Sequence, residues 1–383
     1  MRLRLRGAGL VVLPLTLALA ACGAPPTASS GSEAGAAANG WNEVYDAIDG
    51  LTGEARTQKL VELAKADGGI VRNYSSMNGD EGGALTDAFT QKYGIRVDFY
   101  RASAQGIIQR VTEEVRAGYA NGADVIASNG TELIQFDRQG ILEPIRDSPV
   151  VAEYPPEAVE HNGAWVWTYV NYYTPVWNTN LVSPSEAPKD WMQVLTNFGN
   201  GRCVLEAKSY DWLAALVGYL GKTQGMSEDQ AIQTVKKAAS GCKAAISGNS
   251  LVTNMVASGE YDIVLASYHI NARQGKADGA PMDWFAPPAT VFARPNGVAV
   301  SATAPNPAGA LLFAEFMLSD EGAGVIAKYD RTVANPNVTE GALAPGYEVY
   351  PIDLESVIDE ADKWQALYQE LDGLTAGGCV EGC

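Results

Sequence analysis

Residues 70–100, IVRNYSSMNGDEGGALTDAFTQKYGIRVDFY, contain two apolar strands with a helical pattern between them. Leu85 and Phe89 recur at helical spacing, and Gly94 ends the pattern because glycine readily stops a helix. In residues 95–100 apolar and polar side chains alternate, which is typical of a strand buried on one face. The stretch therefore predicts a strand–helix–strand unit.

The alternation of strands and helices continues beyond this unit. Ser103 is placed to cap a helix in which Ile107 and Val111 share one face, and the apolar run 124–127 predicts a third strand. This order favours an α/β fold with a mostly parallel sheet flanked by helices.

A second α/β unit follows in the middle of the chain. Its elements are predicted at residues 202–207, 211–220, 227–239, 249–258, 261–266, 297–301 and 307–318. Ser227 and Gln230 fit a capping box at the start of one of these helices. Two such units indicate two lobes. Ligands bind beyond the carboxyl ends of parallel strands, so we expect a ligand cleft between the lobes.

The start of the chain has the features of an exported lipoprotein. Residues 1–21 carry three arginines, a short apolar core and small residues before Cys22, which is typical of a secretory signal. The apolar run of about 15 residues is shorter than a membrane-spanning helix requires. Leu19 to Cys22 resembles a bacterial lipobox, so we expect Cys22 to be lipidated. Residues 22–40 are mostly small and predict a flexible tether.

Composition restricts the partners. The formal net charge of −18 disfavours nucleic acid and an anionic membrane surface, so a lipid is needed to hold the protein at a membrane. No stretch after the signal is long and apolar enough to predict a second membrane segment.

The four cysteines other than Cys22 are consistent with export. An even number in an oxidising compartment predicts two disulfides. Cys379 and Cys383 are close enough in sequence to close a small loop, which would leave Cys203 to pair with Cys242. The spacing alone does not fix this connectivity. A four-cysteine metal site is the alternative, but the paired CxxC spacing is missing.

Several short segments, in order from about Leu60 to Asn337, resemble the extracellular solute-binding proteins of ABC importers, in particular the group of ferric-ion binding proteins. The matching segments are Val71–Ser76, Gly122–Val125, Asn178–Val182 with Ala187–Trp191, Gly259–Asp262, and Ala304–Ala310 with Ser319–Gly322. Each is short, but their order over most of the chain is specific.

The resemblance implies a two-lobed periplasmic-binding-protein fold of type II, in which the lobes close on a solute and deliver it to a permease. We assign residues 67–170 and 286–345 to lobe 1, and residues 171–285 to lobe 2. Residues 41–66 are expected to form helices outside this core, and residues 346–383 a C-terminal helix and a cysteine-containing tail. We expect a monomer at the outer face of the cell membrane.

The ligand is expected at strand ends and helix starts, where hydroxyls and backbone N–H groups favour an anion. The candidate residues are Ser75, Ser76, Asn78, Ser128 and Asn129 in lobe 1, Tyr173 near the hinge, and Tyr210, Tyr268, His269 and Arg273 in lobe 2. Each serine is equally consistent with an ordinary helix cap. Tyr173 is also consistent with packing beneath the cleft.

The resemblance makes ferric iron or an iron chelate the nominal cargo, with Tyr268 and His269 as the metal ligands. Ferric-ion binding proteins commonly use two adjacent tyrosines here, so the histidine is a departure, and a synergistic anion held by Arg273 and the serines would have to complete the site. A small organic anion or phosphonate without metal is the alternative, and a polyamine-like cation over Tyr268 is a third.

An enzyme is the less favoured class. The chain has two histidines, His161 and His269, and no G-x-S-x-G motif, so a catalytic triad has few candidates. A signalling module on the same fold is a further alternative. We expect no resident cofactor, because iron would be cargo.

Overall fold

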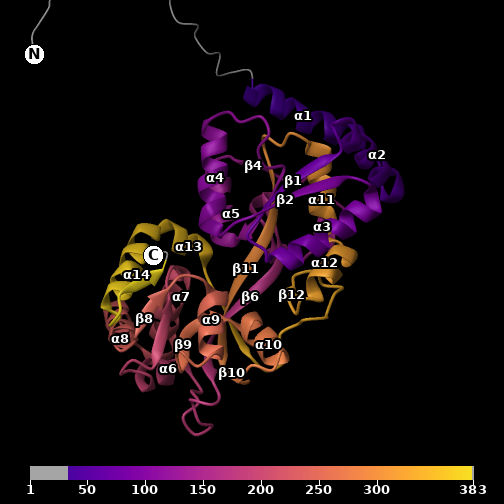
Figure 1. The fold of residues 1–383 in the computed structure, drawn as a ribbon. Coiled ribbons are helices and arrows are strands. Elements are labelled where there is room, and N and C mark those ends of the chain that lie inside the picture. Colours follow the sequence, from indigo (N-terminus) through magenta and orange to yellow (C-terminus); the bar gives the residue numbers. More distant parts are fainter. Residues whose placement is uncertain (1–32, 382–383) are drawn as a thin grey trace, which may run out of the picture.

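The computed structural model describes residues 33–381, which form two lobes joined by a pair of long strands (Figure 1). A single 14-stranded sheet runs through both lobes of the described chain in the order β14-β8-β7-β9-β6-β11-β3-β1-β2. Strands β5, β10 and β12 pair with β6, and β4 and β13 pair with β11.

Lobe 1 has a parallel core of β1, β2 and β3, with β1 in the middle. Its elements are α1 (Glu33–Ile48), α2 (Gly53–Ala66), β1 (Ile70–Ser75), α3 (Gly79–Tyr93), β2 (Arg96–Arg101), α4 (Ala104–Arg116), β3 (Val125–Asn129), α5 (Gly130–Arg138), β4 (Leu142–Glu143), β5 (Val159–Glu160), α11 (Pro307–Leu318), α12 (Asp320–Ala327) and β12 (Thr332–Val333). Three short 3₁₀ helices follow β4, at Val151–Glu153, Pro156–Ala158 and His161–Gly163.

Lobe 2 repeats this arrangement, with β7 paired in parallel to both β8 and β9. Its elements are α6 (Trp191–Asn197), β7 (Cys203–Glu206), α7 (Tyr210–Gln224), α8 (Glu228–Ser240), β8 (Ala244–Ile246), α9 (Asn249–Ala257), β9 (Ile263–Tyr268), α10 (His269–Ala277), β10 (Met282–Trp284), β13 (Glu348–Pro351), α13 (Leu354–Asp359), α14 (Ala361–Leu374) and β14 (Cys379–Glu381). The predicted capping box of Ser227 and Gln230 is present at the start of α8.

The two lobes are joined by β6 (Trp165–Asn178) and β11 (Thr290–Ser301), which run antiparallel to each other. The sequence analysis predicted part of β11 and no strand at the position of β6. The prediction of a strand at 297–301 was too short, because Pro295 lies inside β11, where a proline usually marks the end of a strand. The register of the β6–β11 pair shifts between Asn296 and Gly297, next to this proline.

The N-terminal helices are part of lobe 1. Trp41 of α1 and Leu60 of α2 are fully buried in the same cluster as Phe313 of α11, so the expectation that these helices lie outside the core was wrong. Arg56 also lies 2.6 Å from Glu315 in a buried ion pair. Helix α1 begins at Glu33, within the predicted tether, because alanine-rich sequence is small in side chain but strongly helix-forming.

The C-terminal segment packs mainly on lobe 2, where α14 contacts α7 and α8. It also reaches lobe 1, because α13 contacts α5. Strand β14 extends the sheet beside β8. A disulfide joins Cys203 and Cys242, with Cα atoms 4.5 Å apart, and ties β7 to the turn after α8.

Some sequence predictions fall outside the described residues. These are the signal at 1–21, the lipidated Cys22 and the partner of Cys379 at Cys383. Among the helices that the structure describes, none has the length and apolar character to cross a membrane.

Candidate functional site

A cavity of about 420 Å³ lies between the lobes, within the roughly 300–1,000 Å³ typical of small-molecule sites. Six helices begin at its wall, and the residue at the start of each lines it. These residues are Asn78 of α3, Ser103 of α4, Asn129 of α5, Ser209 of α7, Gly248 of α9 and Tyr268 of α10. Unpaired N–H groups and the helix dipole make each helix start favourable for negative charge.

The floor of the cavity is formed by β6 and β11. Arg294 of β11 is 8% exposed, and its Nε lies 2.6 Å from Asp211 Oδ2 on α7. The same guanidinium donates hydrogen bonds to the Tyr268 hydroxyl of lobe 2 and to Thr131 Oγ1 of lobe 1. Arg294 therefore connects both lobes at the point where the chain crosses between them.

A second buried arginine, Arg331, lies beside this floor. Its guanidinium donates to both carboxylate oxygens of Glu81 at 3.0–3.2 Å and to Asn171 Oδ1 at 3.0 Å. The Asn171 amide donates to Asn296 Oδ1 at 2.9 Å, and Asn296 donates to Asn129 Oδ1 at 3.1 Å. The network fixes the side-chain amides of the floor in one orientation.

Two carboxyl groups line the same cavity. Burial raises the pKa of Glu206 to about 7, although Ser209 and the Gly248 N–H donate hydrogen bonds to it. Burial also raises the pKa of Glu132, which Arg294 partly opposes. One oxygen of Glu132 has no hydrogen-bond partner. Such groups can accept hydrogen bonds from ligand hydroxyls.

The structure brings five of the residues predicted as ligand-binding to the cavity: Ser76, Asn78, Asn129, Tyr210 and Tyr268. The others lie behind it. Ser75 and Ser128 are 1% exposed, and Ser75 Oγ accepts a hydrogen bond from the Met77 N–H. Tyr173 is buried beneath the cavity, where its hydroxyl donates to Asp211 at 3.2 Å and lies 3.4 Å from the Tyr268 hydroxyl.

His269 and Arg273 do not reach this cavity. Tyr268 ends β9, and His269 begins α10, so the change from strand to helix turns the two side chains in different directions. His269 packs edge-on against Trp284, and burial lowers its pKa to about 4. Arg273 pairs with Asp330 at 2.7 Å. Neither residue lines this cavity.

The oxygen atoms around the cavity are largely neutral. Burial raises the pKa of Tyr268, with Arg294 acting against it, and burial raises the pKa of Tyr169 to about 12. Within residues 33–381, no group of three or more His, Cys, Asp and Glu side chains is arranged to hold a metal ion.

Sequence reasoning missed the residues of the floor, above all Arg294 and Arg331. A signal for Arg294 was present, because it is the single charged residue in the otherwise uncharged stretch 289–301. A charge inside an apolar strand is rarely buried unless it is paired. No comparable signal marks Arg331, whose partner Glu81 is distant in sequence.

The geometry is that of a two-lobed protein with a polar cavity between its lobes, as in a receptor for a small solute. The family model described as bacterial extracellular solute-binding protein matches residues 84–367. The chain belongs to this family, and so it is an extracellular solute-binding protein.

Individual relatives are distant. The chain is 24% identical over 267 residues to iron uptake protein A1 of Synechocystis sp. (strain ATCC 27184 / PCC 6803 / Kazusa), covering 67% of this chain and 72% of that protein. The Trichodesmium protein IdiA (FutA), solved with iron and citrate, is 20% identical with a TM-score of 0.60 over 79% of this chain and 99% of its own.

A third relative is the periplasmic binding protein AfuA from Actinobacillus pleuropneumoniae, solved with fructose-6-phosphate. It is 19% identical, with a TM-score of 0.66 over 77% of this chain and 96% of its own. At these identities the solved structures show the fold, and the predicted two-lobed type II architecture is confirmed.

Proposed function

We propose that this receptor captures a small polyhydroxylated organic anion, with sugar phosphates as the first class to test. The observation that carries the proposal is the convergence of six helix starts on a cavity whose floor holds Arg294. An anion would lie against the helix starts and the guanidinium. Glu132, Glu206 and the asparagine amides would accept or donate hydrogen bonds to its hydroxyls.

The charges of the lining support an anion over a free ferric ion. The lining includes Arg101, Lys208, Arg294 and Arg331 against the carboxyl groups of Glu132 and Glu206. Two like unit charges 4 Å apart repel by about 4 kcal/mol at an effective dielectric constant near 20, and a trivalent ion by about three times as much. Asp211 offsets part of this repulsion at Arg294, and Glu81 offsets part of it at Arg331.

Iron carried as a chelate is the second candidate. The hydroxyls of Tyr173 and Tyr268 lie 3.4 Å apart, and phenolate oxygens suit a hard trivalent ion. An organic anion around the iron would satisfy the arginines and the helix starts. The similarity to an iron uptake protein and to a protein solved with iron and citrate supports this candidate.

The proposal also covers where the receptor is located and which protein receives its solute. We propose a non-enzymatic monomer, anchored by lipid on Cys22 at the outer face of the cell membrane, that delivers its solute to an ABC permease in the same membrane. The family to which the chain belongs supports a small solute and a permease partner. The lipobox-like sequence before Cys22 supports the anchor.

The test is isothermal titration of the purified protein with glucose 6-phosphate, citrate, ferric citrate and a ferric salt, each alone. The proposal expects binding of glucose 6-phosphate and no visible tyrosinate-to-iron band with the ferric salt. Binding of ferric citrate with a visible band, and no binding of the phosphate, would replace the first candidate by the second. If none of the four probes binds, both candidate functions are wrong.

A further inference from the structure

A second cavity of about 280 Å³ extends the cleft sideways between the two lobes. Gln105 and Gln109 of α4 line one side, and Gln365 and Gln369 of α14 line the other. Figure 1 shows α4 in lobe 1 above α14, which covers lobe 2. The C-terminal helix α14 therefore supplies a wall that faces lobe 1.

The side cavity adjoins the main cavity. Gln105, Lys208 and Tyr210 line both. Lys208 has a φ of 100°, a backbone conformation that favours glycine and that, in other residues, clusters at functional sites. The volume of the side cavity lies below the roughly 300 Å³ at which independent small-molecule sites begin, so it fits an extension of the main site.

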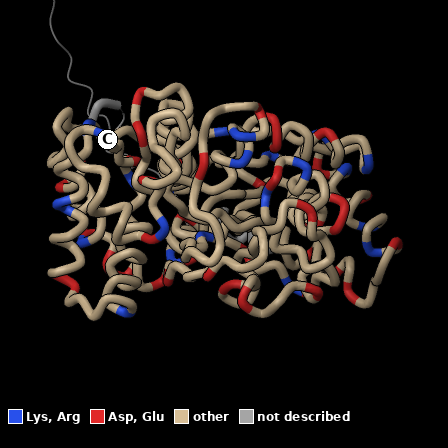
Figure 2. The backbone as a smooth tube through the Cα atoms, turned by 90° about the horizontal axis from the view of Figure 1, so that it is seen from below, with Lys and Arg blue, Asp and Glu red and all other residues tan. Residues whose placement is uncertain are grey.

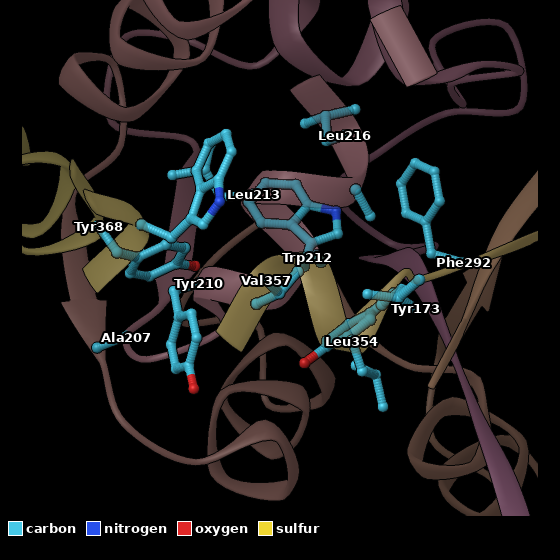
Figure 3. Close-up of a cluster of buried hydrophobic side chains, with 14 of the residues drawn as sticks. Tyr173, Ala207, Tyr210, Trp212, Leu213, Leu216, Phe292, Leu354, Val357 and Tyr368 are labelled. Carbon is cyan, nitrogen blue, oxygen red and sulfur yellow. The ribbon is translucent and has the colours of Figure 1, made fainter. Parts of the chain in front are cut away.

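Two buried side chains that line this cavity each carry an oxygen atom without a hydrogen-bond partner. Tyr210 is 6% exposed, and its hydroxyl makes no hydrogen bond. Figure 3 shows that this hydroxyl points away from the apolar cluster that contains Trp212 and Tyr368. Asp372 is also 6% exposed, with one carboxyl oxygen unpaired. A buried polar group without a partner is costly, so these atoms are candidates for ligand contacts.

We propose that the side cavity is a subsite for the hydroxylated tail of an extended solute whose anionic part occupies the main cavity. This inference rests on the proposed function and adds a substrate class to it: a phosphorylated disaccharide rather than a single sugar. Glutamine amides and a tyrosine hydroxyl both donate and accept hydrogen bonds, which matches sugar hydroxyls. Gln369 and Asp372 lie beyond residue 367, where the match to the family model ends.

The experiment compares a short and an extended probe on the full chain by isothermal titration. The probes are glucose 6-phosphate and trehalose 6-phosphate. The variant is Gln365→Ala/Gln369→Ala, which changes two exposed side chains on α14 and leaves the main cavity intact. The matched control is Gln224→Ala/Gln233→Ala, two exposed glutamines of α7 and α8 that line neither cavity.

We expect the wild type to bind trehalose 6-phosphate about tenfold more tightly than glucose 6-phosphate. The α14 variant should lose about tenfold in affinity for the disaccharide, because two neutral hydrogen bonds are removed, and keep its affinity for glucose 6-phosphate. The control variant should match the wild type.

Three other results would overturn the inference. If the α14 variant binds trehalose 6-phosphate as tightly as the wild type, the subsite is absent while the proposed function stands. If the variant binds both probes more weakly by the same factor, α14 affects the whole cleft and does not bind the hydroxylated tail of the solute. If the wild type binds neither probe, the sugar-phosphate form of the proposed function fails and takes the subsite with it.

Discussion

The floor of the cleft, formed by β6 and β11, and its walls, formed by the helix starts, differ in how their polar groups are paired. On the floor, Arg294 and Arg331 are buried and paired with Asp211 and Glu81. On the walls, neutral side chains stand at helix starts, and the side-chain oxygen of one of them, Asn249, has no partner in the described structure. The floor therefore serves both stability and binding, whereas the walls serve binding when the lobes close.

Acidic and basic residues are interspersed along both lobes in the view of Figure 2. The net charge of −18 thus belongs to the protein as a whole and coexists with a cavity lined by four cationic side chains and two carboxyl groups. A local site can oppose the overall field when its charges are buried and oriented.

The largest expected effect is on stability, from the floor. Arg331→Met leaves the buried Glu81 without its partner, and breaking a buried pair typically costs about 3–5 kcal/mol. The free energy of unfolding, measured in urea, should fall by this amount. Glu81→Gln/Arg331→Met should recover part of the loss. Equal stability of Arg331→Met and wild type would contradict a structural role for this pair.

The second-largest expected effect is a pH dependence of the free energy of unfolding, caused by the cavity-lining residue Glu206. Burial raises the pKa of Glu206 to about 7 from its ordinary value of 4.5. Between these pH values the folded state binds a proton that the unfolded state releases, so the free energy of unfolding falls as the pH rises through this window. Glu206→Gln should remove this contribution, at most roughly 3 kcal/mol.

The pH dependence is checked by urea unfolding at intervals from pH 5 to pH 8. Glu62→Gln, which changes an exposed carboxylate on α2, is the matched control and should keep the wild-type slope. If Glu206→Gln keeps the wild-type slope as well, burial does not perturb Glu206 in the folded protein.

The smallest expected effect is that of a substitution in the walls of the cleft. Asn249→Ala removes a cavity-lining amide whose oxygen has no partner in the protein, so stability should change by less than about 0.5 kcal/mol. The affinity for glucose 6-phosphate should fall about fivefold, the value of one neutral hydrogen bond. Asn254→Ala, on an exposed position of the same helix, should change neither quantity. A large loss of stability in Asn249→Ala would show that the walls are structural too.

The walls could be predicted from the sequence, and most of the floor could not. Ser76, Asn78 and Asn129 follow apolar strands directly, so local patterns were enough to place them at the cleft. Arg294 and Asp211 meet only when β11 passes between the lobes, and no local pattern encodes a contact between segments so far apart in sequence. The predicted length of β11 was too short because Pro295 interrupts the strand pattern in the sequence.

His269 shows a second limit of sequence reasoning. Adjacent residues were assumed to share a site, but Tyr268 lines the cavity while His269 packs against Trp284 behind it. The element boundary falls between the two residues, and boundaries are the least reliable part of a sequence prediction. The anion site expected from helix starts does not depend on that boundary.

The most direct test of the account is the affinity for glucose 6-phosphate when the guanidinium of Arg294 is removed. Asp211→Asn serves as the background, so that no buried carboxylate is left unpaired, and Arg294→Met is added to it. The account predicts a loss of affinity of about 100-fold on adding Arg294→Met, since charge-assisted hydrogen bonds are lost, whereas Tyr268→Phe in the same background costs less than about tenfold. Unchanged affinity on removing Arg294, with binding that depends on Tyr268 and iron instead, would contradict it.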